Sequence, residues 1–262
     1  MTRYLRLFAL QLRVSAAQAM AYRANFLVQG AMSLVWMALT LVPLIVLFDH
    51  RERVANWDRP SALIVIAYFM GVRAVLEGMI SPSLVDLVEK IRSGSFDYVL
   101  LKPVDAQAMI SASHYEPWRV FDLVGAIAVI VYAFAQLGAP PSLAHLAAGI
   151  ALFIAGVLAA YALWILCAAA SFWVVRIDNL MYLLGAIFDI ARWPVDVFQG
   201  AWRFVFTFVI PVAVMTTYPA QALLGTLGAW RTLATVGGSL LLLALGRLVW
   251  RTAIRSYTSA SS

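Results

Sequence analysis

Long apolar runs are the feature that most constrains what this chain can fold into. The run from residue 146 to residue 174 contains no charged side chain, and about 20 apolar residues are enough for a helix to cross a bilayer. Further runs cover residues 25–48, 61–80, 118–138 and 232–249, and a run interrupted by prolines covers residues 179–225. With 63% hydrophobic and 12% charged residues, this pattern predicts an all-α integral membrane protein: one domain over residues 1–262 with six transmembrane helices.

The first 24 residues are a candidate amphipathic helix lying on the membrane surface. Apolar residues recur at helical spacing on one side and arginines fall on the other: Leu5, Phe8, Leu12 and Ala16 against Arg3, Arg6 and Arg13. Such a helix buries one face in lipid and keeps its cations near anionic headgroups. A plain cytosolic extension of the first span is the alternative for residues 1–24.

The distribution of basic residues predicts how the chain is oriented. With the N-terminus inside, the cytosolic flanks hold Arg3, Arg6, Arg13, Arg23, Lys90, Arg92, Lys102, Arg119, Arg176, Arg247, Arg251 and Arg255. The outer side holds Arg51, Arg53, Arg59, Arg192, Arg203 and Arg231, several of them beside acids. The asymmetry predicts that both termini are cytoplasmic, which requires an even number of spans.

The interrupted run contains Pro194, Pro211 and Pro219, and each proline removes a backbone donor and disturbs a helix. Two full spans here would place the C-terminal arginines outside. We therefore expect residues 179–192 to begin the fifth span, and residues 193–225 to form a proline-broken re-entrant hairpin at the outer surface. In the alternative, the later piece spans and the earlier one does not.

Most chemistry is excluded by what the chain lacks. There is no Gly-Lys pair for a phosphate-binding loop, and His50, His114 and His145 lie in separate connections. The single cysteine, Cys167, lies in an apolar run and is interpreted as packing. With only two lysines and dispersed arginines, nucleic acid is not an expected partner. We expect no catalytic residue, no metal and no cofactor in this chain.

Ionisable residues inside the apolar runs are the candidates for a translocation path, because buried charge in a bilayer is costly. Arg73 and Glu77 lie on one helical face in the second span, and Asp189, Arg192 and Asp196 lie near the proline-broken region. The path candidates are Arg73, Glu77, Asp189, Arg192 and Arg203. The alternative roles are a structural ion pair for the first group and interfacial capping for the second.

The polar stretch from residue 81 to residue 117 has its own predicted architecture. Ser81 is expected to cap a helix that starts at Pro82, Gly94 to end that helix in a left-handed conformation, and Asp105 to cap the next one. Between them, "FDYVLLKPVD" carries apolar side chains at Phe96, Tyr98, Leu100 and Leu101. Such a segment docks into a groove on a partner protein. The alternative is packing against its own bundle.

Two stretches resemble the ABC-2 permease family. In "EKIRSGSFDYVLLKPVD" (89–105), the matching residues are Glu89, Arg92, Gly94, Ser95, Phe96, Asp97, Leu100, Leu101, Lys102, Pro103 and Val104. In residues 191–225, they are Arg192, Trp193, Pro194, Trp202, Arg203 and Phe206 to Pro211. The C-terminal "RTAIRSYTSASS" also resembles the family's ending, so the resemblance covers nearly the whole chain.

The resemblance implies a half-transporter that pairs with a second permease, identical or different, and carries two ATP-binding subunits that hold ATP and Mg. Residues 81–117 would be the coupling segment, a cytosolic coupling helix. The coupling residues it implies are Glu89, Arg92, Gly94, Phe96, Asp97, Leu101, Lys102 and Pro103.

We expect the permease subunit of an exporter for a small amphiphilic, drug-like or lipid-like compound, in contact with lipid in the bacterial plasma (inner) membrane. An integral-membrane lipid-modifying enzyme and a secondary transporter are the alternatives. The first needs a cluster of acids or histidines near one interface, and the second inverted repeats; neither pattern is evident. The substrate and the identity of the second permease stay open.

Overall fold

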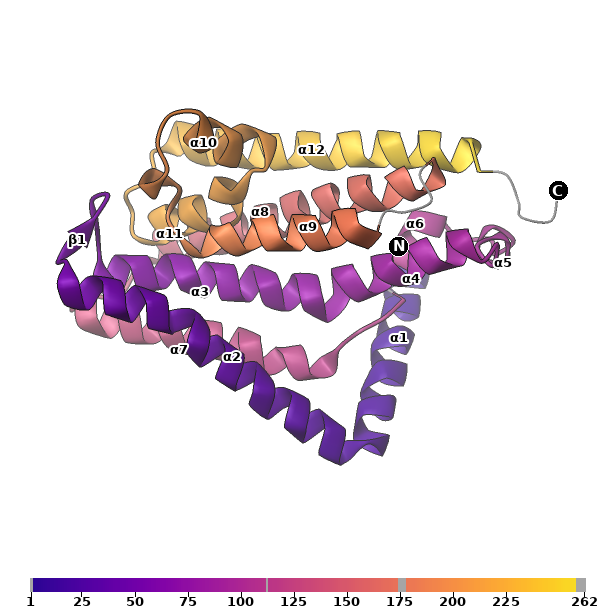
Figure 1. Ribbon diagram of the computed structural model, residues 1–262, viewed down its shortest axis with the longest axis horizontal. Coiled ribbons are helices and arrows are strands. Elements are labelled where there is room, and N and C mark those ends of the chain that lie inside the picture. The colour runs from indigo at the N-terminus through magenta and orange to yellow at the C-terminus, as the bar shows by residue number, and fades with distance from the viewer. Residues whose placement is uncertain (1, 112, 174–177, 258–262) are drawn as a thin grey trace.

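The computed structural model describes residues 2–111, 113–173 and 178–257, and in these residues the chain is almost wholly helical (Figure 1). The long helices are α1 (Thr2–Ala21), α2 (Arg23–His50), α3 (Arg59–Val75), α4 (Ser81–Arg92), α7 (Val120–Leu137), α8 (Leu143–Ala169), α9 (Asp178–Phe188) and α12 (Ala229–Arg255). The short ones are α5 (Asp97–Leu100), α6 (Ala106–Ile110), α10 (Gly200–Phe204) and α11 (Tyr218–Leu223). Arg176 and residues 258–262, which the orientation and the C-terminal resemblance used, lie outside the described residues.

Helix α1 crosses the common direction of the bundle and meets α2 at Tyr22, the one residue between them (Figure 1). Along α1, Phe8 packs edge-on against Tyr115, with ring centroids 5.5 Å apart. A helix therefore forms where the sequence predicts an amphipathic one. Its location on a membrane surface stays a prediction.

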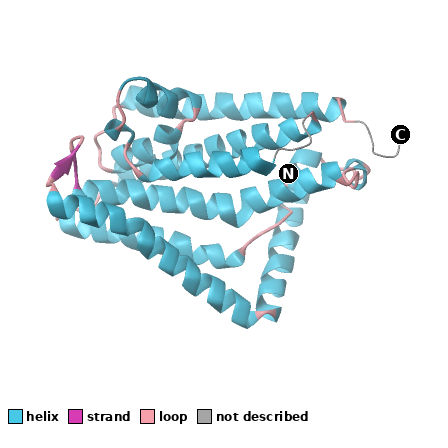
Figure 2. Cartoon of the chain, in the orientation of Figure 1, coloured by secondary structure: helices cyan, strands magenta, loops and turns pink. Residues whose placement is uncertain are grey.

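A small hairpin joins α2 to α3 and is the only strand pair in the described residues (Figure 2). Strands β1 (Arg53–Val54) and β2 (Trp57–Asp58) pair antiparallel, and both turn residues, Ala55 and Asn56, have positive φ, as a tight hairpin turn requires. Asp58 then accepts a hydrogen bond from the Ser61 backbone N–H at 3.1 Å and caps α3. The hairpin and this cap therefore set where α3, the most buried helix, begins.

Helix α3 is the centre of the bundle. Every residue from Ala62 to Val72 is buried, which is the pattern of a helix packed on all sides rather than on one face. Helix α8 lies close to α3 and to the segment around Met215, and small residues of α8 are at both contacts. A Cβ on Gly156 would lie 2.9 Å from the Met215 Cα, and one on Gly149 would lie 2.6 Å from the Tyr68 hydroxyl. Small residues at such crossings let helix backbones come close enough to pack without a hydrophobic driving force.

The second span does not end where the sequence predicts. Helix α3, the π-helical segment η1 (Leu76–Ile80) and α4 form one continuous 34-residue helix. The expected cap at Ser81 is wrong, because Ser81 is itself helical and makes no capping hydrogen bond. Pro82 has no N–H to donate, and the helix accommodates it with the wider turn of η1. The Gly78 carbonyl accepts instead from the Glu116 N–H at 2.8 Å.

Among the described residues, five helices are long and apolar enough to cross a membrane: Arg23–His50, Arg59–Arg92, Pro117–Leu137, Leu143–Phe172 and Ala229–Arg255. A further pair, Gly200–Val209 and Ala213–Leu223, meets the same test together but is bent by 71° across Pro211. The pair contains two π-helical segments, η6 (Val205–Val209) and η7 (Ala213–Thr217). The chain is therefore a multi-pass membrane protein, and its described residues contain five candidate spans, or six if the bent pair counts as one.

The two ends of the bundle carry different structures (Figure 1). The start of α1, the end of α12, α4, α5 and α6 lie at one end. The β-hairpin, α10 and α11 lie at the opposite end. That both termini are cytoplasmic stays a prediction.

Candidate functional site

The end of the bundle that holds α4 and α5 presents an apolar tip. Gly94 has φ +74° and ends α4 in the left-handed conformation that the sequence predicts. The Phe96 N–H then donates to the Lys90 carbonyl at 3.0 Å and closes the turn into α5. Past this turn Leu101 is 80% exposed and Tyr98 is 72% exposed. We call Tyr98, Leu100, Leu101, Lys102 and Pro103, all exposed, the coupling tip.

Phe96 does not belong to this exposed surface. Its side chain is fully buried, and its ring packs edge-on against Phe172, Trp250 and Tyr257 with centroids 5.2 to 6.4 Å away. The prediction of an exposed Phe96 is therefore wrong. The alternative, packing against the chain's own bundle, holds for this residue, which anchors the segment between α8 and α12.

A polar clasp ties the same segment to the bundle at its other end. Asp105 caps α6 as predicted, accepting from the Ala108 N–H at 3.0 Å, and it also pairs with Arg247 of α12. Arg247 donates to the Gln107 amide oxygen at 2.6 Å, and the Gln107 amide donates to the Tyr161 hydroxyl at 2.8 Å. The Arg247 guanidinium lowers the pKa of the Asp105 carboxyl below its ordinary value. The clasp links residues 105–107 to α8 and α12.

The remaining predicted coupling residues lie on the surface of α4 and around its end. Arg92 donates to the Glu89 carboxylate at 2.5 Å, three residues away. Lys90 pairs with Asp86 in the same way, one turn apart. Asp97 begins α5. The structure thus gathers Glu89, Arg92 and Asp97 around the glycine turn and leaves Leu101, Lys102 and Pro103 exposed beyond it.

A chain of ion pairs crosses the bundle at the level of the π-helical segment η1. Arg73 Nε donates to Glu77 Oε1 at 2.7 Å, and Arg73 Nη1 lies 3.3 Å from Asp189 Oδ1. Glu77 also pairs with Arg119, which lies 3.1 Å from Asp122. The two predicted groups, Arg73 with Glu77 and Asp189 with Arg192, are therefore parts of one network.

The sequence interpretation missed Arg119, Glu116 and Asp122, the centre of this network. It assigned Arg119 to a cytosolic flank and gave the two acids no role. Their spacing was a usable signal, because Glu116, Arg119 and Asp122 follow one another every three residues and an i,i+3 spacing brings side chains together on a helix. Burial raises the pKa of the Glu116 carboxyl, and the nearby Arg119 opposes that shift.

The second half of the network surrounds an aromatic ring. Arg192 Nε donates to the Asp189 carbonyl at 2.8 Å, and both Arg73 and Arg192 hold their guanidinium carbons 5.9 Å from the centre of the Phe69 ring. Two cations on one ring are stabilised by the carboxylate of Asp189 between them. This arrangement neutralises the charges inside the bundle.

Arg203, the last predicted path residue, is not part of that network. Its guanidinium donates to Asp196 at 2.8 Å, near the β-hairpin end of the bundle. The indole N–H of Trp57 donates to the same carboxylate at 3.1 Å. The path candidates are thus divided between two sites, and Asp196 belongs with Arg203.

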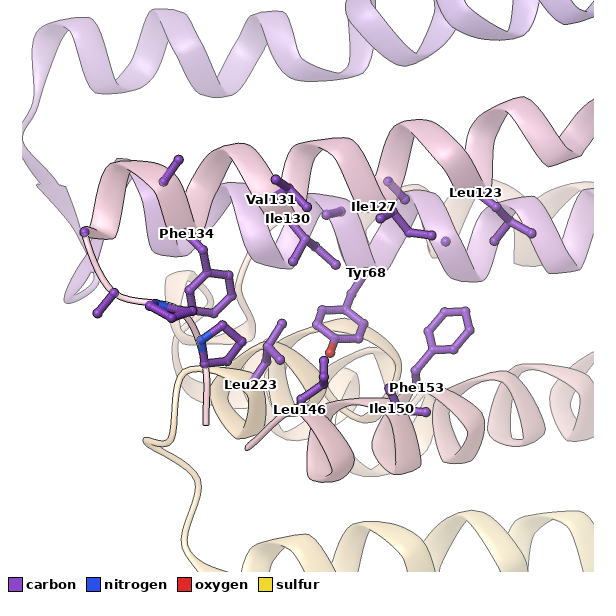
Figure 3. Close-up of a pocket in the computed structure, with 18 residues that line it drawn as sticks. Tyr68, Leu123, Ile127, Ile130, Val131, Phe134, Leu146, Ile150, Phe153 and Leu223 are labelled. Carbon is purple, nitrogen blue, oxygen red and sulfur yellow. The ribbon is translucent and has the colours of Figure 1, made fainter. Parts of the chain in front are cut away.

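An apolar cavity of about 840 Å³ lies between α3, α7 and α8 (Figure 3). Tyr68 and Phe153 project into it from facing helices, with ring centroids 6.1 Å apart. The Tyr68 hydroxyl is the one polar side-chain group in its lining. The cavity offers a hydrocarbon environment and no group for catalysis. Among the described residues, no cluster of three or more His, Cys, Asp or Glu is placed to hold a metal ion.

Several apolar helices long enough to span a bilayer, with a network of paired charges among them, define a multi-pass membrane protein. The family model described as "ABC-2 family transporter protein" matches residues 34–261, and the chain belongs to that family. No curated protein and no solved structure matches it. The family makes the chain the permease subunit of an ABC transporter and not a catalytic enzyme.

Proposed function

We propose that this chain is the permease subunit of an ATP-driven exporter that moves a small amphiphilic, drug-like or lipid-like compound. Two ATP-binding subunits dock at the α4–α5 end of the bundle, hold ATP and Mg, and hydrolyse the ATP. The observation that carries the proposal is the coupling tip. An 80% exposed leucine on a rigid extension of a span favours docking to a partner protein.

The segment is built to transmit force. Because α3, η1 and α4 are one helix, a push that reaches α4 through the Gly94 turn is carried along a continuous helix to the centre of the bundle. Phe96 and the Asp105 clasp hold the two ends of the tip to α8 and α12. Closure of the ATP-binding subunits would therefore move α3, α8 and α12 together, and such rigid-body shifts are the usual way in which packed helices switch states.

Six spans follow if α9 crosses the bundle, with residues 193–225 as a re-entrant hairpin at the outer surface. Phe172, before α9, packs against Trp250 at the terminal end, with centroids 5.7 Å apart. Asp196, after it, accepts from Trp57 in the β-hairpin at the opposite end. These contacts support a crossing between residues 173 and 195, although α9 itself has only 11 residues. Both termini are then cytoplasmic.

The cargo class is argued from the polarity of the bundle. The cavity of Figure 3 is apolar, and the charges of the Arg73–Glu77 network are paired with one another. A path for ions or sugars needs polar groups left open to the substrate, whereas an amphiphile is moved along apolar walls. A second permease, identical or different, completes the path in the bacterial plasma membrane.

One experiment tests the coupling function. The chain is co-expressed with the products of its neighbouring genes, purified in mild detergent, tested for a copurifying ATP-binding subunit, and assayed for ATPase activity with and without amphiphilic compounds. We expect Leu101→Asp to reduce the stimulation of ATPase activity by the compounds more than about tenfold, because the substitution places a charge in an apolar interface. The protein itself stays folded, since Leu101 makes little contact with its own bundle.

Leu143→Asp is the matched control, because Leu143 is 85% exposed and lies at the start of α8, away from the coupling tip. It should keep full stimulation. Copurification without any ATP-binding subunit would refute the function, and normal stimulation in Leu101→Asp would refute the docking surface.

A further inference from the structure

A second cavity, of about 880 Å³, lies between α12 and the bent pair Gly200–Leu223. It differs from the cavity of Figure 3 because its lining contains charged and polar side chains as well as apolar ones. Phe204, Phe208, Leu241, Leu242 and Leu245 provide hydrocarbon walls. Asp196, Arg203, Tyr218, Gln221 and Arg231 provide polar groups in the same lining. An amphipathic lining fits an amphipathic ligand.

The polar groups gather at one end, and they leave positive charge available there. Asp196 is already held by three donors: Arg203 at 2.8 Å, Trp57 at 3.1 Å and Gln221 at 3.5 Å. The Tyr218 hydroxyl lies within the electrostatic reach of Asp196, Arg203 and Arg231 together. In the described part of the chain, Arg231 has no carboxylate within ion-pair distance. This end therefore carries two arginines and one acid.

The cavity has the length of a lipid chain. Its wall on α12 runs from Trp230 to Leu245, which is about 22 Å at a rise of about 1.5 Å per residue. One leaflet of a bilayer offers about 15 Å of hydrocarbon. Trp230 is 79% exposed beside Arg231, and tryptophan at the end of a span is typical of the membrane–water interface. The polar end therefore lies where lipid headgroups lie.

We propose that this cavity binds one molecule of an anionic phospholipid-like amphiphile. The phosphate-bearing headgroup contacts Arg231 and the free N–H groups of Arg203, and an acyl chain lies along α12 between Phe204, Phe208 and Leu245. The inference deepens the proposed function by naming the class of amphiphile, and it rests on that function for the claim that the bound molecule is cargo. The binding itself is a property of this chain alone.

Two adjacent glycines give a sharp test. Gly238 lines the cavity, whereas Gly237 is outside the lining, and a Cβ added to either one would meet no atom within 4 Å. Gly238→Trp therefore places an indole in the cavity with no clash at its Cβ. Gly237→Trp makes the same chemical change one position away and leaves the cavity open. Both lie in the regular part of α12, so their effects on the helix are matched.

The chain is purified without other subunits and titrated with dioleoyl phosphatidylglycerol or dioleoyl phosphatidylcholine, and bound lipid is counted by native mass spectrometry. We expect one phosphatidylglycerol to be retained about tenfold more tightly than phosphatidylcholine, because the headgroup charge is paired. Gly238→Trp should lose that lipid, while Gly237→Trp keeps it. Arg231→Gln should remove the tenfold preference, and Arg255→Gln, with the same change in net charge at the far end of α12, should preserve it.

Equal retention by Gly238→Trp and the unaltered chain overturns the site. Equal retention of the two lipids by the unaltered chain overturns the headgroup assignment. A Gly238→Trp variant that changes the protein's oligomeric state but not its bound lipid shows that a second copy covers the cavity, which also overturns the proposal. Because no ATP-binding subunit is present, these failures are distinct from a failure of the ATPase experiment.

Discussion

Phe96 and Leu101 lie five residues apart in one motif and have opposite environments: the first is fully buried and the second is 80% exposed. The sequence predicts that both side chains dock on a partner protein; this is wrong for Phe96, and for Leu101, which is exposed, it stays a prediction. Hydrophobicity alone does not separate the two residues, because a tertiary contact decides which side chain faces inward. For Phe96 that contact comes from Trp250 and Tyr257, more than 150 residues later in the chain.

Glu77 is the residue on which the charge network depends, since it pairs with both Arg73 and Arg119. Glu77→Gln leaves two guanidinium groups short of a counter-charge. We expect it to cost about 1–3 kcal/mol of stability, the range for losing hydrogen bonds to charged groups. Thermal unfolding in detergent, followed by tryptophan fluorescence, should show a midpoint lower by several degrees.

Asp49→Asn is the control for that measurement. It removes an isolated ion pair with Arg59, 3.8 Å long and with both side chains 40% exposed or more, and such pairs contribute only about 0–1 kcal/mol. If Glu77→Gln and Asp49→Asn unfold at the same temperature, the network is not a stabilising unit.

At the scale of elements, the clasp between Asp105 and α12 makes stability depend on pH in a defined direction. Arg247 lowers the folded-state pKa of Asp105 below its ordinary value of 3.8. The contribution is therefore complete above that ordinary value, and it is lost as the pH falls through the lower folded-state pKa. Asp105→Asn should destabilise the chain by roughly 1 kcal/mol at neutral pH.

Unfolding midpoints of Asp105→Asn and the unaltered chain, measured from pH 8 to pH 3, test this contribution. The difference between them should be constant down to about pH 4, where the ordinary pKa of aspartate lies, and should shrink below it. A difference that shrank already near pH 6 would mean that another group is responsible. In Arg247→Gln, the effect of Asp105→Asn should be largely absent, since the two residues act as a pair.

At the scale of the whole molecule, the location of Gln199 decides whether α9 or the bent pair Gly200–Leu223 crosses the bilayer between α8 and α12. Gln199 is exposed and lies between α9 and α10, immediately before the first residue of α10. If α9 crosses the bilayer, Gln199 is outside; if the bent pair crosses instead, Gln199 is inside. In a Cys167→Ser background, which removes the single cysteine, we expect Gln199→Cys in intact cells to react with a membrane-impermeant maleimide.

Thr226→Cys and Leu101→Cys calibrate that experiment. Thr226 is exposed in the connection between α11 and α12, and Leu101 is exposed at the coupling tip. With the N-terminus cytoplasmic, as proposed, either topology puts Thr226 outside and Leu101 inside. Protection of Gln199→Cys, together with labelling of Thr226→Cys, would show that the bent pair spans.

The positions of most long helices could be read from apolar runs, since bilayer thickness sets their length, but the end of the second one could not, because α3 continues through η1 into α4. The glycine stop at residue 94 and the cap at Asp105 were also predictable, because both depend on local backbone chemistry. What could not be predicted is long-range. The joining of Glu77 to Arg119 and of Arg73 to Asp189 depends on how separate helices pack, and a single sequence carries no direct signal of that.

The π-helical segment between Leu76 and Ile80 also sets the phase of everything after it. Each residue in a helix turns the following side chains by about 100°. A π-helical turn holds about one residue more than an α-helical turn, so a deletion of one residue in this segment would let the helix close into a regular α-helix and keep Leu84, Leu87 and Val88 facing the core. The same deletion in the regular turn of α4 before Leu84 would turn these buried side chains away and aim the coupling tip in a new direction. A one-residue deletion should therefore be tolerated better in the π-helical segment than in α4.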